Sequence, residues 1–295
     1  MKRMKHNKFF LLQIIVILFA GLLCSAESMG RNTCTLNIGS FNISYDNKKE
    51  EVGWEYRKES VASLIRFHEW DVFGTQEGQS YLLEDIAGEE YDYVFANGFF
   101  NQKNPDIDLE RSQHNGIFWL KNKFELLDTG SFWLSETPDV KSFGWDAAES
   151  RGCVWVKLKE RNTNITFFFF CVHFDHRGVI ARQNSALLVL NKIQEIAIDF
   201  PVFCVGDFNG SADAEHIQTM KANGLLYDSY DISQSPPYGT KGTSNQYKKD
   251  SAMDQRIDYI WVTEDIEVKK FGVLNEMPYN RFTSDHFPIM IKAEL

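Results

Sequence analysis

The run Phe200-Pro201-Val202-Phe203-Cys204-Val205-Gly206-Asp207-Phe208-Asn209 passes abruptly from apolar side chains to a carboxylate and an amide. A short apolar segment bounded by a proline and a glycine is typical of a buried β-strand. On an extended segment Asp207 and Asn209, two positions apart, point the same way out of the end of the strand. That geometry suits a metal ion or a water molecule, although Gly-Asp after a strand also occurs as a solvated turn.

The N-terminal segment 1–26 has the layout of a secretory signal peptide. Four basic residues precede a mostly apolar run from Phe9 to Leu23, and the small pair Ser25-Ala26 follows it. We therefore predict a signal peptide at 1–26 and a single domain at 27–295. The run leaves two alternatives open: an uncleaved membrane anchor and, because Cys24 follows it, a lipoprotein. The predicted location of the domain is extracytoplasmic, meaning periplasmic, at the cell surface or secreted.

Charge and cysteine usage narrow the class of protein. The formal net charge is −10, and removal of 1–26 takes away four basic and no acidic residues, which changes it to −14. An acidic surface argues against tight binding to a nucleic-acid backbone without sequence preference. The remaining cysteines lack the close spacing of a zinc site and lie in apolar runs, which favours buried thiols and leaves a disulfide possible: Cys34, Cys153, Cys171 and Cys204.

Predicted strands and helices alternate along the domain. Helical spacing predicts helices at 55–70, 178–198 and 212–223. Apolar and alternating runs predict further strands at 34–43, 71–77, 91–96, 115–121, 124–134, 151–158, 163–175, 256–262, 266–274 and 289–295. The run Phe167 to Phe170 predicts a central strand that is covered on both faces. Three polar segments are predicted to be long loops that set substrate specificity: 97–114, 135–150 and 231–254.

Six segments each place an acid, an amide or an imidazole at the end of a strand. These residues are Asn42, Glu77, His173, Asp207 with Asn209, Asp258, and Asp285 with His286. None of them is convincing when it is taken singly. His173 fits a structural histidine, and Asp258 fits an ion pair with its neighbour Arg256. Their order along the chain is therefore more informative than any one of them.

The sequence resembles the endonuclease/exonuclease/phosphatase superfamily, in a bacterial secreted branch. Six motifs in the family's order carry the resemblance and span the predicted domain: Ser40-Phe41-Asn42, Thr75-Gln76-Glu77, Val172-His173, Gly206-Asp207-Phe208-Asn209, Arg256-Ile257-Asp258-Tyr259-Ile260 and Ser284-Asp285-His286. The resemblance implies an α/β (α+β) fold of the deoxyribonuclease I type. This is a four-layer sandwich of two mixed β-sheets flanked by helices, with the site at one edge.

The resemblance also implies a metal-dependent hydrolase that acts on phosphoester bonds. The anionic oxygens of a phosphoester repel a nucleophile, so the site needs a hard cation and hydrogen-bond donors around the phosphorus. The expected cofactor is Mg²⁺ or Mn²⁺, which prefer oxygen ligands. The expected metal ligands are Glu77 and, directly or through water, Asn42 and Asp285.

Catalytic roles follow for the other motif residues. Asp207 and Asn209 are expected to hold and activate the attacking water, or to help bind a second metal ion. His173 and His286 are expected to donate hydrogen bonds to non-bridging oxygens or to the leaving group, and Asp258 to orient an imidazole.

Two arginines are candidates for binding the substrate. Arg151 either contacts the phosphate or is a solvated charge at the end of a strand. Arg177 lies just before the predicted helix 178–198, at whose N-terminus an anion would meet free backbone N–H groups. The alternative for Arg177 is an ion pair with Asp175 that only fixes the turn.

The expected function is a secreted phosphoesterase, in first place a phosphodiesterase, that uses metal-activated water. Its substrate is a small-molecule, lipid- or glycan-linked phosphoester, or a nucleic acid. One alternative is an endonuclease or exonuclease acting on DNA or RNA, since deoxyribonuclease I is itself an acidic secreted member. The other is a non-catalytic module that binds a phosphorylated ligand. The sequence indicates no obligate protein partner and favours a monomer.

Overall fold

A computed structural model describes residues 33–49, 51–96 and 112–295. The predicted signal peptide and most of the predicted loop 97–114 lie outside these residues. None of the helices in the described ranges is long and apolar enough to cross a membrane.

Two six-stranded mixed sheets contain the strands of the described residues, and the site lies at strand ends of both. The first sheet has the order β11-β12-β1-β2-β4-β3, with only β1 and β2 parallel: β1 (Thr35–Asn42), β2 (Val72–Gly78), β3 (Tyr91–Ala96), β4 (His114–Leu120), β11 (Glu267–Val273) and β12 (Ile289–Glu294). The second has the order β5-β6-β7-β8-β10-β9, with only β7 and β8 parallel: β5 (Phe124–Trp133), β6 (Gly152–Glu160), β7 (Thr166–His173), β8 (Val202–Asp207), β9 (Tyr227–Asp228) and β10 (Asp258–Val262).

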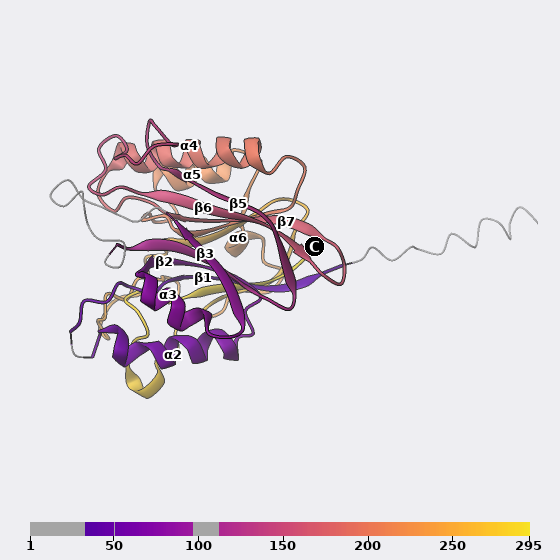
Figure 1. Ribbon diagram of the computed structural model, residues 1–295. Coiled ribbons are helices and arrows are strands. Elements are labelled where there is room, and N and C mark those ends of the chain that lie inside the picture. The colour runs from indigo at the N-terminus through magenta and orange to yellow at the C-terminus, as the bar shows by residue number, and fades with distance from the viewer. Residues whose placement is uncertain (1–32, 50, 97–111) are drawn as a thin grey trace, which may run out of the picture. The chain divides into compact units, whose positions relative to one another are not determined.

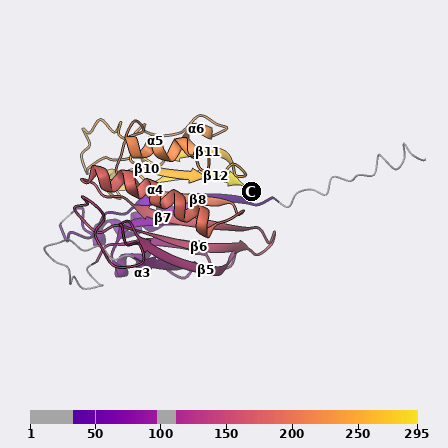
Figure 2. The same cartoon turned by 90° about the horizontal axis from the view of Figure 1, so that it is seen from above.

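Helices cover the outer faces of the two sheets (Figure 1). Over the first sheet lie α2 (Trp54–Phe67) and α3 (Ser80–Ala87). Over the second lie α4 (Val179–Ile196) and α5 (Glu215–Ala222), which Figure 2 shows from above. Two short helices complete the described residues: α6 (Ser229–Ile232) and η1 (Pro278–Asn280). This helix–sheet–sheet–helix arrangement confirms the four-layer sandwich predicted from the sequence.

Apolar side chains hold the layers together. Phe167 and Phe169 of β7 pack between the sheets, whereas Phe168 and Phe170 pack beneath α4, and all four are buried. This alternation confirms that the phenylalanine run is a strand covered on both faces. The cysteines of the described residues are buried free thiols, which confirms that prediction as well.

Two glycines permit the close approaches on which the site depends. Gly206 has φ +152°, and a Cβ there would lie 2.0 Å from the carbonyl oxygen of Val172 in the neighbouring strand. A Cβ at Gly74 in β2 would lie 2.6 Å from Cγ2 of Val205 in the other sheet. A side chain at either position would push apart strands that carry site residues.

The structure differs from the sequence prediction in a few elements. The helix α3 was not predicted, because its eight residues are too few to show a clear helical period. The predicted strand 256–262 begins only at Asp258, because Arg256 turns away to pair with Asp228, with Nη2 and Oδ2 2.6 Å apart. The ion pair between Arg256 and Asp258 that the sequence left open is therefore wrong.

Candidate active site

Strand register brings the predicted catalytic residues together. His173 pairs with Asp207 across the parallel strands β7 and β8, and Asp207 pairs with Asp258 across β8 and β10. The first sheet contributes Asn42, the last residue of β1, and Glu77 near the end of β2. Residues far apart in sequence therefore meet at one end of the sandwich because the strands that carry them are aligned.

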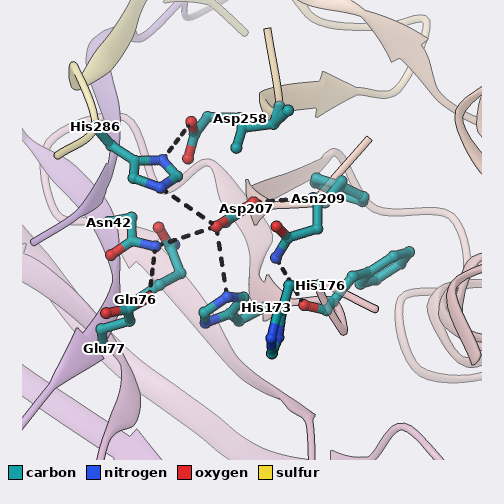
Figure 3. Close-up of polar contacts among 12 residues, drawn as sticks. Asn42, Gln76, Glu77, His173, His176, Asp207, Asn209, Asp258 and His286 are labelled. Atoms are coloured by element: carbon teal, nitrogen blue, oxygen red, sulfur yellow. Dashed lines mark hydrogen bonds and ion pairs between the residues drawn. The ribbon is translucent and has the colours of Figure 1, made fainter. Parts of the chain in front are cut away.

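Asp207 is the shared acceptor at the centre of this group (Figure 3). Its Oδ2 lies 3.1 Å from Nδ2 of Asn42, 3.4 Å from Nε2 of His173 and 3.8 Å from Nε2 of His286. Its Oδ1 accepts a hydrogen bond of 2.9 Å from the backbone N–H of Asn209. A single buried carboxylate is therefore held by donors from three other segments of the chain and by a backbone N–H of its own segment.

The environment of Asp207 favours its protonated form. Burial and the nearby Asp258 raise the pKa of Asp207 from 3.8 to about 7, against the opposing effects of His286, Asn209 and Asn42. A carboxylate with a pKa near neutral pH can exchange protons with water or substrate under physiological conditions. That property suits a general base.

His286 is held in the charged form by two carboxylates. Its Nδ1 donates to Oδ2 of Asp258 at 2.8 Å, so the carboxylate–imidazole pair expected from the sequence is formed. Burial alone would lower the pKa of His286, but Asp258 and Asp207 outweigh it and raise the pKa well above its usual value. The imidazolium therefore keeps its Nε2–H as a donor directed toward Asp207.

Glu77 is the carboxylate best suited to hold a hard cation. It lies where β2 and β4 slip register between Thr75 and Gly78, and its backbone has a φ of +64°. Such bulges redirect side chains beside active sites. Burial and then the negative charge of Asp285 raise the pKa of Glu77. Two partly buried carboxylates that repel each other fit a divalent ion with oxygen ligands.

The donor set fits the metal that the sequence predicts, with one change of role. Asn42 donates from Nδ2 to both Glu77 and Asp207 at 3.2 and 3.1 Å, and its Oδ1 accepts from the Ser44 N–H at 3.1 Å. It therefore steadies the two carboxylates and presents its amide nitrogen, not its oxygen, to the site. A divalent ion at Glu77 and Asp285 would supply Lewis acidity to the phosphoester and to a bound water.

A second group of side chains also has the spacing of a metal site. Ligand atoms of Asp207, Asp258 and His286 lie within 4.8 Å of one another. An imidazolium cannot ligate a cation, so this group holds an ion only in the state in which His286 has lost its proton. Glu77 with Asp285 and this second group are therefore both candidate positions for the ion.

Asn209 does not lie on an extended segment as the sequence suggested. Its backbone has a φ of +49°, and its Nδ2 donates to the carbonyl oxygen of Phe174 at 3.0 Å. The chain turns directly after β8, so the two side chains of Asp207 and Asn209 do not run parallel. The contact of Asn209 with Asp207 is made by its backbone instead.

Arg151 is buried, with only 5% of its side chain exposed, so the interpretation as a solvated charge is wrong. Its Nη1 lies 3.2 Å from Nδ1 of His173, and its Nη2 lies 3.2 Å from Nδ1 of His176. Glu149 and Asp175 lie 3.6 and 3.9 Å from the guanidinium. Nothing in the sequence shows that His176 shares this partner with His173.

The surroundings of Arg177 contradict the ion pair with Asp175, whereas its contact with substrate stays a prediction. Arg177 is exposed, and within the described residues its side chain forms no ion pair with Asp175. Asp175 instead accepts from the backbone N–H groups of Arg177 and Gly178 at 2.8 and 2.6 Å. The first amides of α4 are also occupied, since Asp146 accepts from the N–H of Ala181 at 2.7 Å. Free N–H groups for an anion are therefore absent at these positions.

Arg57 is a residue of the site region that the sequence did not reveal. It is 1% exposed and donates to the carbonyl oxygens of Ile43, Ser44 and Thr283 at 2.6 to 2.8 Å. These bonds tie the end of β1 to the segment that carries Asp285. The available signal was its helical spacing, which puts this arginine on the buried face of α2.

The fold and the site together define a phosphoester hydrolase that depends on a metal ion. The chain belongs to the endonuclease/exonuclease/phosphatase family, whose sequence profile matches residues 34–286. Members of this family are metal-dependent hydrolases of phosphoesters, and the chain is an enzyme of this class.

Solved structures of known proteins agree with this assignment. The chain is similar to a mannosyl-6-phosphatase of Bacteroides thetaiotaomicron, with 34% identity, a TM-score of 0.79 and coverage of 88% of this chain and 99% of that one. It is also similar to an endonuclease/exonuclease/phosphatase family protein of the same organism, with 33% identity, a TM-score of 0.81 and coverage of 89% and 98%. An uncharacterised protein of Acanthamoeba polyphaga mimivirus is 26% identical over 88% of this chain and 99% of its own length.

Proposed function

We propose that the protein removes the phosphate group from a phosphorylated sugar, by attack of water on a phosphate monoester with a divalent ion at Glu77 and Asp285. The convergence of Asn42, His173 and His286 on the Asp207 carboxylate carries the hydrolytic part of this proposal. The similarity to a mannosyl-6-phosphatase over nearly the whole of both chains supports the sugar monoester. The proposal thus prefers a monoester to the diester favoured by the sequence.

Each side chain of the site has its own role in the proposed reaction. Asp207 accepts the proton of the attacking water, for which its pKa of about 7 is well matched. The charged His286 donates from Nε2 to a phosphate oxygen or to the leaving alcohol, and Asp258 keeps its imidazole oriented. His173 supplies a second, neutral donor.

Charge also supports a small substrate. A monoester dianion brings two negative charges to one point, where His286, Arg151 and a divalent ion offset them. A nucleic acid brings a row of charges, and the formal net charge of −10 for the chain opposes its approach.

The test compares four substrate types with the full chain in Mg²⁺ or Mn²⁺. These are mannose 6-phosphate, p-nitrophenyl phosphate, bis-p-nitrophenyl phosphate, and single- and double-stranded oligonucleotides. We expect release of inorganic phosphate from the sugar monoester to have the highest kcat/KM and to stop in chelator. Faster cleavage of the diester or of an oligonucleotide would overturn the sugar monoester. Turnover that persists after complete metal removal would overturn the mechanism.

We also propose that the segment 1–26 exports the enzyme and is then removed. Its basic start, apolar run and small residues support this proposal. N-terminal sequencing of the protein from the extracytoplasmic fraction should find a mature chain that begins near residue 27. An intact N-terminus with the protein in the cytoplasm would exclude export by this route.

A further inference from the structure

The guanidinium of Arg151 bridges two histidines of the site. Its Nη1 lies 3.2 Å from Nδ1 of His173 and its Nη2 lies 3.2 Å from Nδ1 of His176. The arginine is 5% exposed and His173 is 2% exposed, whereas His176 reaches the surface. The two imidazoles are therefore neighbours that share one buried cation.

The chemistry of these contacts fixes where each imidazole carries its hydrogen. A guanidinium is always charged and has only N–H donors, so it cannot accept a hydrogen bond. Nδ1 of His173 and Nδ1 of His176 must then be the acceptors, and an acceptor nitrogen carries no hydrogen. The single hydrogen of each neutral ring therefore lies on Nε2.

The two Nε2–H groups face away from Arg151, because the two nitrogens of an imidazole point in nearly opposite directions. For His173 the direction is known, since its Nε2 lies 3.4 Å from Oδ2 of Asp207 at the centre of the site. For His176, which is exposed, the direction is outward from the buried guanidinium toward the surface.

The electrostatic environment keeps both rings neutral. Burial and then Arg151 lower the pKa of His173, and the same two causes lower the pKa of His176. Glu149 and Asp175 lie 3.6 and 3.9 Å from the guanidinium and hold it from the other side. Breaking this arrangement would leave a buried charge without its partners.

We propose that Arg151 is a positioning residue that fixes His173 and His176 as paired Nε2–H donors, and that His176 is a further substrate-binding residue for an anionic phosphate oxygen. The geometry assigns Arg151 to the histidines in place of the direct phosphate contact expected from the sequence. The part that concerns Arg151 depends only on the contacts above. The part that concerns His176 rests on the proposed phosphoester hydrolysis.

The first experiment reads the tautomers directly and does not depend on activity. Long-range ¹H–¹⁵N spectra of the full chain with ¹⁵N-labelled histidine resolve the seven histidines, and His173→Gln and His176→Gln variants assign the two signals. At pH 7 we expect both rings in the neutral Nε2–H form. In Arg151→Met both should shift toward a mixture of tautomers or toward the charged form, while the exposed Arg161→Met changes neither. Either ring in the Nδ1–H form in the unaltered protein, or no change in Arg151→Met, would overturn the positioning role.

A second variant keeps this test decisive if Arg151→Met does not fold. Arg151→Lys preserves the charge but offers one compact ammonium in place of the two-pronged guanidinium. We expect one histidine to keep its tautomer and the other to lose it. Both rings unchanged in Arg151→Lys would show that the two-pronged contact does not set them.

Kinetics with a substrate that the enzyme turns over test the role of His176. His176→Phe should raise KM about 10-fold through loss of one hydrogen bond to a charged oxygen, with kcat changed less. His176→Gln, whose amide N–H can take the place of Nε2–H, should recover most of that loss. Arg151→Met should lower kcat/KM about 10- to 100-fold, as is usual for residues that orient a functional side chain. Equal KM values for His176→Phe and the unaltered enzyme would overturn the binding role, even with the Arg151 result intact.

Discussion

Replacing Asp207 by Asn is expected to stabilise the metal-free protein while it removes most of the activity. Burial and the neighbouring Asp258 raise the pKa of Asp207 from 3.8 to about 7 in the folded chain. Each pKa unit corresponds to about 1.36 kcal/mol, so ionised Asp207 costs the folded state about 4 kcal/mol above pH 7. Asparagine carries no charge and does not incur the cost of burying one.

The direction in which stability changes with pH follows from the linkage between proton binding and folding. Because the folded-state pKa lies above the unfolded one, the contribution of Asp207 to stability is fully present below pH 3.8. It is lost progressively as the pH rises through about 7. Asp207→Asn and the unaltered protein should therefore have equal free energies of unfolding near pH 4. Between pH 4 and pH 8 the variant should gain an advantage of up to about 4 kcal/mol.

Urea unfolding in chelator at several pH values between 4 and 8 measures this difference. Asp213→Asn is a matched control on the segment that follows β8, because Asp213 is exposed and its hydrogen bond with Ser211 lowers its pKa. Its replacement should give a small effect of the opposite sign. Parallel curves for Asp207→Asn and the unaltered protein, or a less stable variant at pH 8, would refute the reasoning. Parallel curves would mean that folding leaves the pKa of Asp207 unchanged, and a less stable variant at pH 8 would mean that the fold stabilises the ionised carboxylate.

Three further changes test the metal position, the buried arginine and the strand contact. Glu77→Gln should lower kcat/KM at least about 100-fold and abolish the rise in melting temperature on adding Mg²⁺ or Mn²⁺. In the unaltered protein, an ion at 100 times its Kd should stabilise the fold by about 2.7 kcal/mol. An unchanged rise in the variant would place the ion elsewhere. Arg57→Met should lower the free energy of unfolding by about 3 kcal/mol in urea titrations, since its carbonyl partners lose their donors; an unchanged value would show that those bonds add no net stability. Gly206→Ala should yield little folded protein by circular dichroism, because its Cβ would lie 2.0 Å from the Val172 oxygen; normal folding would contradict that contact.

The predictable part of the molecule is the part set by short periodic patterns. Alternation and apolar runs give strands, and polar residues at strand ends give candidates for a site. The run Phe167 to Phe170 shows why this works, since a strand covered on both faces must be apolar at every position. Strand alignment then brings these candidates together, as it does for His173 beside Asp207.

The unpredicted part depends on contacts between residues far apart in sequence. Asp146 occupies the amides of α4 across 35 positions, and Arg57 reaches Thr283 across 226. Local backbone geometry was also missed at Asn209, where the left-handed φ of +49° turns the side chain to Phe174. No periodic pattern records such contacts, because each depends on where the rest of the chain places its partner.

The two histidines that face Asp207 are held in different protonation states by the groups behind them. Behind His286 stands a carboxylate, Asp258, which accepts its Nδ1–H and favours the imidazolium. Behind His173 stands a guanidinium, Arg151, which donates to Nδ1 and disfavours a second positive charge. Both rings therefore present an Nε2–H to the same carboxylate, but only the ring of His286 can give its proton away at neutral pH. The acid of the proposed reaction is then His286, and His173 serves as a fixed donor whose charge does not change during turnover.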